Sequence, residues 1–267
     1  MKKLTIFIVF CLVLLSVTAN LSFAAGIREP KKGDLWVLAV GIDQYSDNQA
    51  FPNLSFAVSD AENVRNLFNL QKGKAFERVN TLLVTDTGIS PTRNNILSSL
   101  SFLQNAGPND TVILYFALHS ILDGDGNYYL IPSDYTISSE DELFYEESLI
   151  NFNDIILSMD IPGKKIIILD THFGETAINM VSGREIAILG ACKDNEHAYE
   201  SLITGGGFLT TSIIEAFSGD EALNGDITLA NLFNFLTERV SQISQNRQTP
   251  VLRVPASMQR LVIGVND

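Results

Sequence analysis

Short, continuous runs of apolar residues recur along the chain and predict strands that are buried on both faces. Leu35–Gly41 reads LWVLAVG and Thr111–Ala117 reads TVILYFA, so neither run alternates polar with apolar positions. Continuous apolar strands are typical of parallel sheets that helices cover on both sides. Runs of similar character lie at residues 79–84, 128–132, 166–169, 185–191, 251–254 and 261–265.

Segments with apolar residues three and four positions apart lie between these runs and predict amphipathic helices. Residues 60–70 carry such a face, formed by Ala61, Val64, Leu67 and Phe68. The other predicted helices cover residues 90–103, 150–159, 208–217 and 229–243. The alternation of strands and helices predicts an α/β fold, with a mostly parallel sheet and helices on both of its faces. In such a sheet the functional site lies at the carboxyl ends of the strands.

The amino-terminal residues predict a segment that is removed from the mature protein. Lys2 and Lys3 precede an apolar run at residues 6–17, and Ser22 and Ala24 are small residues that suit cleavage after position 24. This order is typical of a secretory signal peptide, and the apolar run is short for a membrane span. The predicted parts of the chain are a signal peptide at residues 1–24, a short linker at 25–34 and one domain at 35–267.

The signal peptide predicts export to the periplasm or the extracellular space, with no integral membrane segment after its removal. The chain has 18 lysines and arginines against 31 aspartates and glutamates, which gives a net charge of −13. Loss of Lys2 and Lys3 with the signal peptide makes the mature chain more acidic still. An acidic chain without a basic stripe does not suit nucleic acid and favours basic partners.

Cysteine usage leaves the mature protein with a single thiol. The chain has two cysteines, and one of them, Cys11, lies within the predicted signal peptide. Cys192 is then alone, so no intramolecular disulfide forms even in an oxidising compartment. A lone cysteine in an exported protein is most often a small buried side chain.

Residues capable of catalysis or metal binding follow three of the predicted strands. His119 comes two positions after Thr111–Ala117, and the sequence Asp170-Thr171-His172 follows the run at 166–169. Cys192 follows the run at 185–191. Because the carboxyl ends of parallel strands meet at one edge of a sheet, we expect these side chains to lie close together.

This arrangement resembles the caspase and metacaspase family of cysteine peptidases, in its bacterial form. In that family one strand ends in Ser-Gly-His-Gly and a second ends in Asp-(Ala/Thr)-Cys-His-Ser-Gly. His119 matches the family histidine, whereas His172 stands at the position of the nucleophilic cysteine. The resemblance runs from about residue 35 to about residue 254. It implies a three-layer αβα sandwich around a mostly parallel six-stranded sheet.

Further segments are similar to the family in the same order along the chain. Residues 54–61 (LSFAVSDA) resemble the metacaspase sequence Leu-x-Gly-Cys-x-Asn-Asp-Ala, and residues 190–195 (GACKDN) resemble Ser-Gly-Cys-Lys-Asp-Asp. Residues 248–250 match the Gln-Thr-Pro that precedes the last family strands. The resemblance implies that Asp60 and Asp194 line the S1 pocket, which receives a lysine or arginine side chain of a peptide or protein.

The departures from the family pattern favour a pseudopeptidase, an inactive homologue that binds a basic segment without cutting it. An imidazole cannot form the thioester that a thiolate forms, so His172 cannot replace the nucleophile. The surroundings of the two catalytic positions also differ, with Leu118 and Ser120 beside His119 and Phe173 after His172. In the family, backbone N–H groups at these positions stabilise the oxyanion, a contribution of about 10²–10³ in rate for one donor.

Two alternatives remain open at the level of sequence. An active cysteine endopeptidase would use His119 as the base and Cys192 as the thiol. A metal site for Zn²⁺ or Cu²⁺ would draw on His119, His172, Cys192 and His197, because imidazole and thiolate are ligands that these ions prefer. Outside this second alternative we expect no metal and no cofactor.

Overall fold

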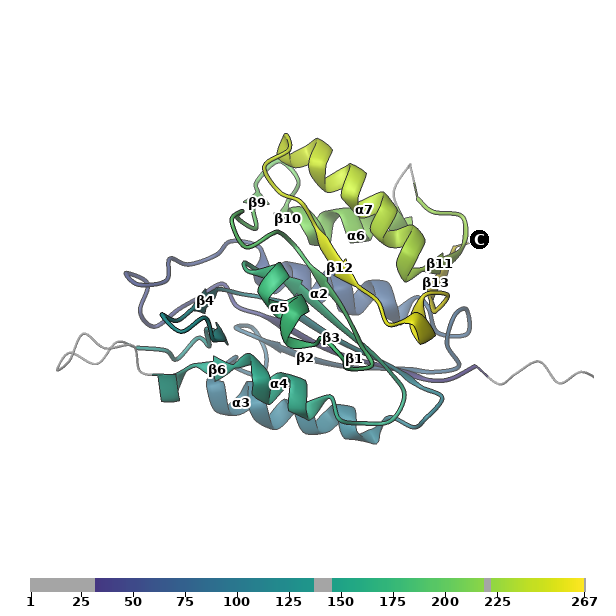
Figure 1. Ribbon diagram of the computed structural model, residues 1–267, viewed down its shortest axis with the longest axis horizontal. Helices are drawn as coiled ribbons and strands as arrows, with labels where there is room; N and C mark the ends of the chain where they lie inside the picture. The colour runs from purple at the N-terminus through teal and green to yellow at the C-terminus, as the bar shows by residue number, and fades with distance from the viewer. Residues whose placement is uncertain (1–31, 137–145, 219–221, 267) are drawn as a thin grey trace, which may run out of the picture. The chain divides into compact units, whose positions relative to one another are not determined.

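The computed structural model describes residues 32–136, 146–218 and 222–266, which form the domain drawn in Figure 1. The predicted signal peptide at 1–24 and the linker residues 25–31 lie outside the described residues. Within the described part of the chain, no helix combines the length and the apolar character that a bilayer crossing requires.

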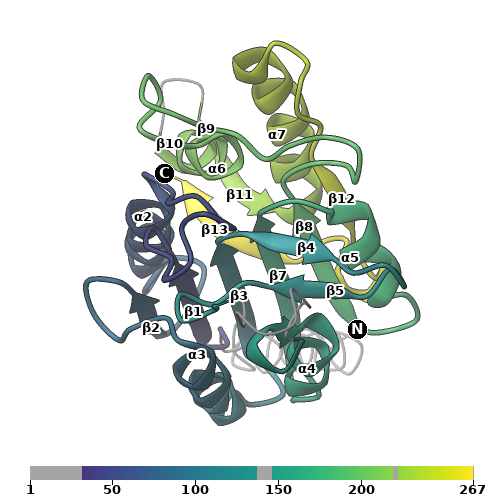
Figure 2. The same ribbon diagram turned by 90° about the vertical axis from the view of Figure 1, so that its left-hand side faces the viewer.

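A six-stranded sheet forms the centre of the domain. Its strands stand in the order β12-β8-β7-β3-β1-β2, and all neighbours run parallel except β12 and β8. Figure 2 shows this order from one edge of the sheet to the other. The sheet consists of β1 (Leu35–Gly41), β2 (Val79–Thr85), β3 (Thr111–Ala117), β7 (Lys164–Asp170), β8 (Ile186–Gly190) and β12 (Val251–Arg253). The mostly parallel six-stranded sheet predicted from the sequence is confirmed.

Helices cover both faces of this sheet and complete three layers (Figure 1). On one face lie α2 (Ala57–Asn69), α6 (Phe208–Ser218) and α7 (Leu229–Ser244). On the other face lie α3 (Arg93–Ser99), α4 (Phe152–Ser158) and α5 (Gly174–Met180), together with a 3₁₀ helix over Leu100–Asn105.

The central strands are continuously apolar because helices cover both faces of the sheet, so that every side chain along a strand packs against apolar neighbours. Successive residues of a strand point to opposite faces of the sheet. In β3, Val112, Leu114 and Phe116 pack towards α3, α4 and α5, whereas Ile113 and Tyr115 pack towards α2, α6 and α7. Every position of β3 is buried, so the strand has no polar side to expose.

Short strands form three smaller sheets around the central one. They are β4 (Ser120–Leu122) with β5 (Tyr128–Leu130) and β6 (Ile150–Asn151), β9 (Glu200–Ser201) with β10 (Gly206–Gly207), and β11 (Gly225–Thr228) with β13 (Val262–Asn266). Two further 3₁₀ turns cover Glu146–Ser148 and Ala256–Met258. The hairpin of β9 and β10 is important for the site, because it leads directly into α6.

The start of α2 differs from the sequence prediction, and a contact with a residue distant in sequence lies beside it. The helix predicted at 60–70 begins three residues earlier, at Ala57. Just ahead of it, the carboxylate of Glu200 accepts hydrogen bonds from the backbone N–H groups of Ser55 (2.9 Å) and Phe56 (3.2 Å). This contact spans about 145 residues of sequence, so no local pattern could have indicated it.

Three other differences concern short elements. The segment predicted as one helix at 90–103 is α3 followed by a 3₁₀ helix, and the segment at 150–159 begins as β6 before it becomes α4. The helix α5 has no counterpart among the helices predicted from the sequence. This helix has only seven residues and begins after Phe173, which adopts a left-handed conformation (φ 63°). A helix of that length is too short for apolar periodicity to be visible.

Gly41 is expected to be essential for the close packing of β1 against α2. A Cβ atom at this position would lie 2.2 Å from the carbonyl oxygen of Ala57 and 2.9 Å from Cβ of Ala61. Because the first of these atoms belongs to the backbone of α2, it cannot move without moving the helix. We expect Gly41→Ala to lower the free energy of unfolding by about 2–3 kcal/mol, as overpacking does elsewhere.

Urea denaturation followed by circular dichroism measures this change. Gly124→Ala is the matched control, because a Cβ atom at Gly124 meets no atom within 4 Å. We expect the control to change stability by no more than about 0.5 kcal/mol. Equal stabilities of the two variants would show that α2 does not need this close approach.

Candidate functional site

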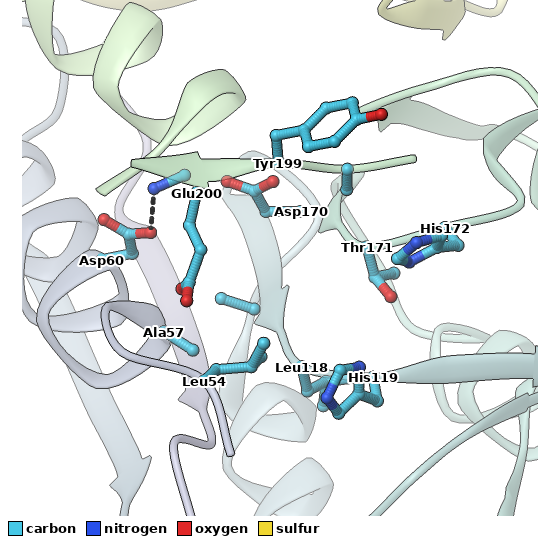
Figure 3. Close-up of a pocket in the computed structure, with 13 residues that line it drawn as sticks. Leu54, Ala57, Asp60, Leu118, His119, Asp170, Thr171, His172, Tyr199 and Glu200 are labelled. Carbon is cyan, nitrogen blue, oxygen red and sulfur yellow. Dashed lines mark hydrogen bonds between the residues drawn. The ribbon is translucent and has the colours of Figure 1, made fainter. Parts of the chain in front are cut away.

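A pocket opens at the carboxyl-terminal edge of the central sheet, where β3 and β7 end side by side. Ala117 of β3 pairs with Asp170 of β7, so His119 and His172 each lie two residues beyond a paired position. The pocket encloses about 490 Å³, part of it open to solvent. It is lined by Leu54, Ala57, Asp60, Ala117, Leu118, His119, Asp170, Thr171, His172, Ala198, Tyr199, Glu200 and Gly207. In Figure 3 three carboxylates lie on one side of the view and two imidazoles on the other.

His119 is held in one tautomer by the backbone. Its Nε2 lies 2.7 Å from the carbonyl oxygen of Pro52. Since a carbonyl only accepts, Nε2 carries the proton and Nδ1 is left as the acceptor. Its backbone N–H donates to the hydroxyl of Tyr45 (2.9 Å), whose ring centroid lies 4.9 Å from the imidazole. Burial lowers the pKa of His119 below its usual value, which favours the neutral base.

His172 faces the same pocket from the loop that follows β7. Its carbonyl oxygen accepts hydrogen bonds from the hydroxyls of Tyr128 (3.0 Å) and Ser120 (3.3 Å), which fix the backbone. Its Nε2 lies 3.0 Å from Nδ1 of His197, a residue of the loop between β8 and β9. Burial, followed by the proximity of His197 and His119, lowers the pKa of His172 to about 4.

Two aspartates meet at the floor of the pocket. Asp60 of α2 accepts a hydrogen bond on Oδ2 from the backbone N–H of Gly207 (2.8 Å). Asp170 at the end of β7 accepts two on its Oδ2, from the backbone N–H (3.1 Å) and the hydroxyl (2.6 Å) of Thr210. Burial raises the pKa of Asp60 well above that of an exposed carboxyl, and the nearby charge of Asp170 raises it further. Burial also raises the pKa of Asp170.

Gly207 lies between these two carboxylates because it has no side chain. A Cβ atom there would lie 2.5 Å from Oδ2 of Asp170 and 3.1 Å from Oδ2 of Asp60. The glycine thus lets the start of α6 come close enough to donate hydrogen bonds to both acids. In Figure 3 the bond from Gly207 to Asp60 is the dashed line at the left.

Glu200 is the third carboxylate of the pocket, and it was not among the site residues predicted from the sequence. It belongs to β9, and its two oxygens accept from the backbone N–H groups of Ser55 and Phe56. Tyr199 beside it also lines the pocket and donates its backbone N–H to the side chain of the buried Gln248 (2.9 Å). The one sequence feature that pointed to this loop was the Gln-Thr-Pro segment at residues 248–250, because Gln248 accepts the hydrogen bond from Tyr199.

Asp194 does not accompany Asp60, and this corrects the expected composition of the pocket. Its oxygens accept from the backbone N–H (3.0 Å) and the hydroxyl (2.7 Å) of Thr176, in the first turn of α5. It is not among the residues that line the pocket. The physical reason is that the loop after β8 turns towards α5, so that Asp194 caps this helix. The acid that accompanies Asp60 is Asp170, the terminal residue of β7.

Cys192 lies near the site but does not face the pocket. Its side chain is buried, and its sulfur lies 3.7 Å from the carbonyl oxygen of Thr171 and 3.6 Å from that of Glu196. Burial raises the pKa of the Cys192 thiol to about 12, with a smaller contribution from the charge of Asp170. Such a thiol provides almost no thiolate at neutral pH.

The four residues considered for a metal site do not come together as one set. His172 contacts His197, whereas His119 lies across the pocket with Nε2 on Pro52 and Cys192 is turned to backbone carbonyls. Among the described residues, no group of three or more histidines, cysteines, aspartates or glutamates is arranged to hold a metal ion.

Comparisons with known proteins agree with this geometry. A family model described as "Caspase domain" matches residues 35–260. Among solved structures, the crystal structure of protein GSU0716 from Geobacter sulfurreducens superposes with a TM-score of 0.61 at 11% identity. The match covers 89% of this chain and 100% of that one, and at this identity it speaks for the fold alone. The search of curated proteins found no match.

The family model spans most of the chain and includes every residue that lines the pocket. The three layers and the mostly parallel six-stranded sheet are those that the family resemblance implied. The chain belongs to the caspase-domain family.

Proposed function

We propose that this protein is an exported, inactive caspase-fold homologue that binds a peptide or protein segment through a lysine or arginine side chain. One observation carries the proposal: Asp60, Asp170 and Glu200 line one pocket, and none of the residues lining it is a lysine or arginine. Opposite charge in a partly desolvated slot is the usual means of selecting an ammonium or guanidinium group. The pattern of residues 1–24 supports export, and the mass of the mature protein in the secreted fraction tests it.

The hydrogen bonds within the pocket leave oxygens for such a ligand. The donors on Gly207 and Thr210 go to Oδ2 of Asp60 and Oδ2 of Asp170. The Oδ1 atoms are therefore the oxygens that we expect to contact the incoming cation. Glu200 holds its position through two backbone donors, and its charge adds to the attraction at the mouth of the pocket.

Among the described residues no thiol lines the pocket, and this supports binding without cleavage. His172 stands where the family has its cysteine, and an imidazole cannot form a thioester. Cys192 is buried and does not line the pocket, and burial raises its pKa to about 12, which favours the protonated thiol. His119 is a competent base in the neutral form, but it has no thiol within the pocket to activate.

Asp60→Asn is expected to weaken binding of a lysine-containing peptide by about 10- to 100-fold, because a charge-assisted contact contributes roughly 1.5–3 kcal/mol. Fluorescence anisotropy with labelled peptides that differ only in Lys, Arg or Ala at one position measures this change. Asp194→Asn is the matched control and should leave the affinity unchanged, since Asp194 caps α5 outside the pocket. Equal affinity for the Lys and Ala peptides would refute the proposed recognition.

Binding of the basic side chain is expected to strengthen as the pH rises. Burial raises the pKa of Asp60 in the ligand-free pocket, so a proton occupies this acid at pH values where exposed aspartates are ionised. A cation favours the ionised form, so its binding releases that proton. The affinity should therefore increase from about pH 5 until the pH exceeds the raised pKa of Asp60.

Dissociation constants measured across this range, and calorimetry in buffers of different ionisation enthalpy, report the released proton. Asp60→Asn removes the ionisation of residue 60, so the affinity should level off at a lower pH than in the wild type. The remaining pH dependence then comes from Asp170, whose pKa burial raises to about 6. An affinity that strengthens towards acid pH would contradict the assignment of Asp60 as the titrating group.

We expect the wild-type protein to cleave no member of a peptide panel with Lys, Arg or Asp at the scissile position. His172→Cys restores a thiol at the end of β7, across the pocket from His119, and should produce slow cleavage after Lys or Arg. Mass spectrometry of the digests detects either result. Cleavage by the wild type that is lost in Cys192→Ser would establish the cysteine-peptidase alternative instead.

A further inference from the structure

Two imidazoles beside the pocket form a pair that recognition of a basic side chain does not use. Nε2 of His172 lies 3.0 Å from Nδ1 of His197. The ring centroids are 5.1 Å apart, and the ring planes are inclined by 77°. The pair joins the loop after β7 to the loop after β8, across 25 residues of sequence.

Both rings are reachable from solvent, and one of them has a fixed backbone. His197 is exposed and His172 is partly exposed. The hydroxyls of Tyr128 and Ser120 both donate to the carbonyl oxygen of His172 and so define where its side chain begins. An ion could therefore reach the pair without disturbing the core of the domain.

We propose that His172 and His197 are the two protein ligands of a divalent transition-metal ion of the Cu²⁺, Ni²⁺ or Zn²⁺ class. Imidazole nitrogens bind such ions at about 2.0–2.1 Å, so two nitrogens in neighbouring coordination positions lie roughly 3 Å apart. The separation of 3.0 Å between Nε2 of His172 and Nδ1 of His197 satisfies this condition.

In the metal-free protein, the same two nitrogens share a hydrogen bond. On metal binding, the proton between them moves to the outer nitrogen of its own ring, and each inner nitrogen donates a lone pair to the ion. Both ligands stay neutral, so the ion keeps its full charge. Imidazole suits Cu²⁺, Ni²⁺ and Zn²⁺, and Cu²⁺ is expected to bind most tightly among them.

Among the described residues no third metal-binding side chain is arranged to join the pair, so the site has two protein ligands and completes its coordination with water. Nε2 of His119 donates to Pro52, and the sulfur of Cys192 is turned to the carbonyls of Thr171 and Glu196. The described residues contain no larger set of metal-binding side chains. A metal bound here would carry exchangeable waters at the edge of the pocket.

The test is a calorimetric titration of chelator-treated, tag-free protein with Cu²⁺, Ni²⁺ and Zn²⁺ salts at neutral pH. We expect one ion per chain, with Cu²⁺ bound most tightly, and nitrogen hyperfine structure in the electron paramagnetic resonance spectrum of the Cu²⁺ form. His197→Ala should weaken binding by at least about tenfold. Because His197 is exposed, thermal unfolding should show that this variant folds normally.

His119→Ala is the matched control, since it removes the third histidine of the chain without touching the pair. It should leave the metal affinity unchanged. Absence of saturable binding would overturn the proposal. Binding that His197→Ala does not weaken would also overturn it and would assign the bound ion to other surface groups. No peptide is present in the titration, so its outcome is independent of the proposed recognition of a basic side chain.

Discussion

The placement of the buried Asp60 beside the partly buried Asp170 is the constraint on which the rest of the site depends. Removing Asp60 and Asp170 from water is unfavourable unless donors replace the lost hydration. Backbone and hydroxyl donors of the β10–α6 segment meet this need, and Gly207 gives them room because it has no side chain. The elements α2, β7 and α6 must therefore converge, and Gly41 permits this convergence by letting α2 lie against β1.

The carboxylates of the pocket and the imidazole of His172 are held in place by different contacts. The carboxylates belong to α2, β7 and β9 and are fixed by backbone donors that reach across the sheet. His172 belongs to a loop, where the hydroxyls of Tyr128 and Ser120 hold its carbonyl oxygen and Nδ1 of His197 lies 3.0 Å from its Nε2. None of these contacts involves Asp60, Asp170 or Glu200, so a different side chain at position 172 should leave the three acids in place.

The sequence was sufficient for features that depend on local pattern. Leu35–Gly41 and Thr111–Ala117 have the predicted bounds, because fully buried strands are continuous apolar runs, and each of these two follows a polar residue, Asp34 or Asp110. Adjacent ends for β3 and β7 followed from the rule that parallel strands share a carboxyl edge. Glu200 and the exclusion of Asp194 could not be predicted, because loop direction and contacts between distant residues decide them. The sequence shows where the acidic residues are, but not that Glu200 faces the pocket and Asp194 does not.

The acidic pocket also links ligand binding to stability. A carboxyl whose pKa is raised by folding stabilises the protein below its ordinary pKa of about 4, and this contribution is lost as the pH rises through the raised value. Asp60 is such a group, since burial raises its pKa. Near neutral pH, ionised Asp60 in the pocket therefore lowers the stability of the fold, and the cation proposed to bind there would offset this loss. Stabilisation by a basic ligand should then be greater in alkaline than in acidic solution, because only the ionised pocket benefits from the added positive charge.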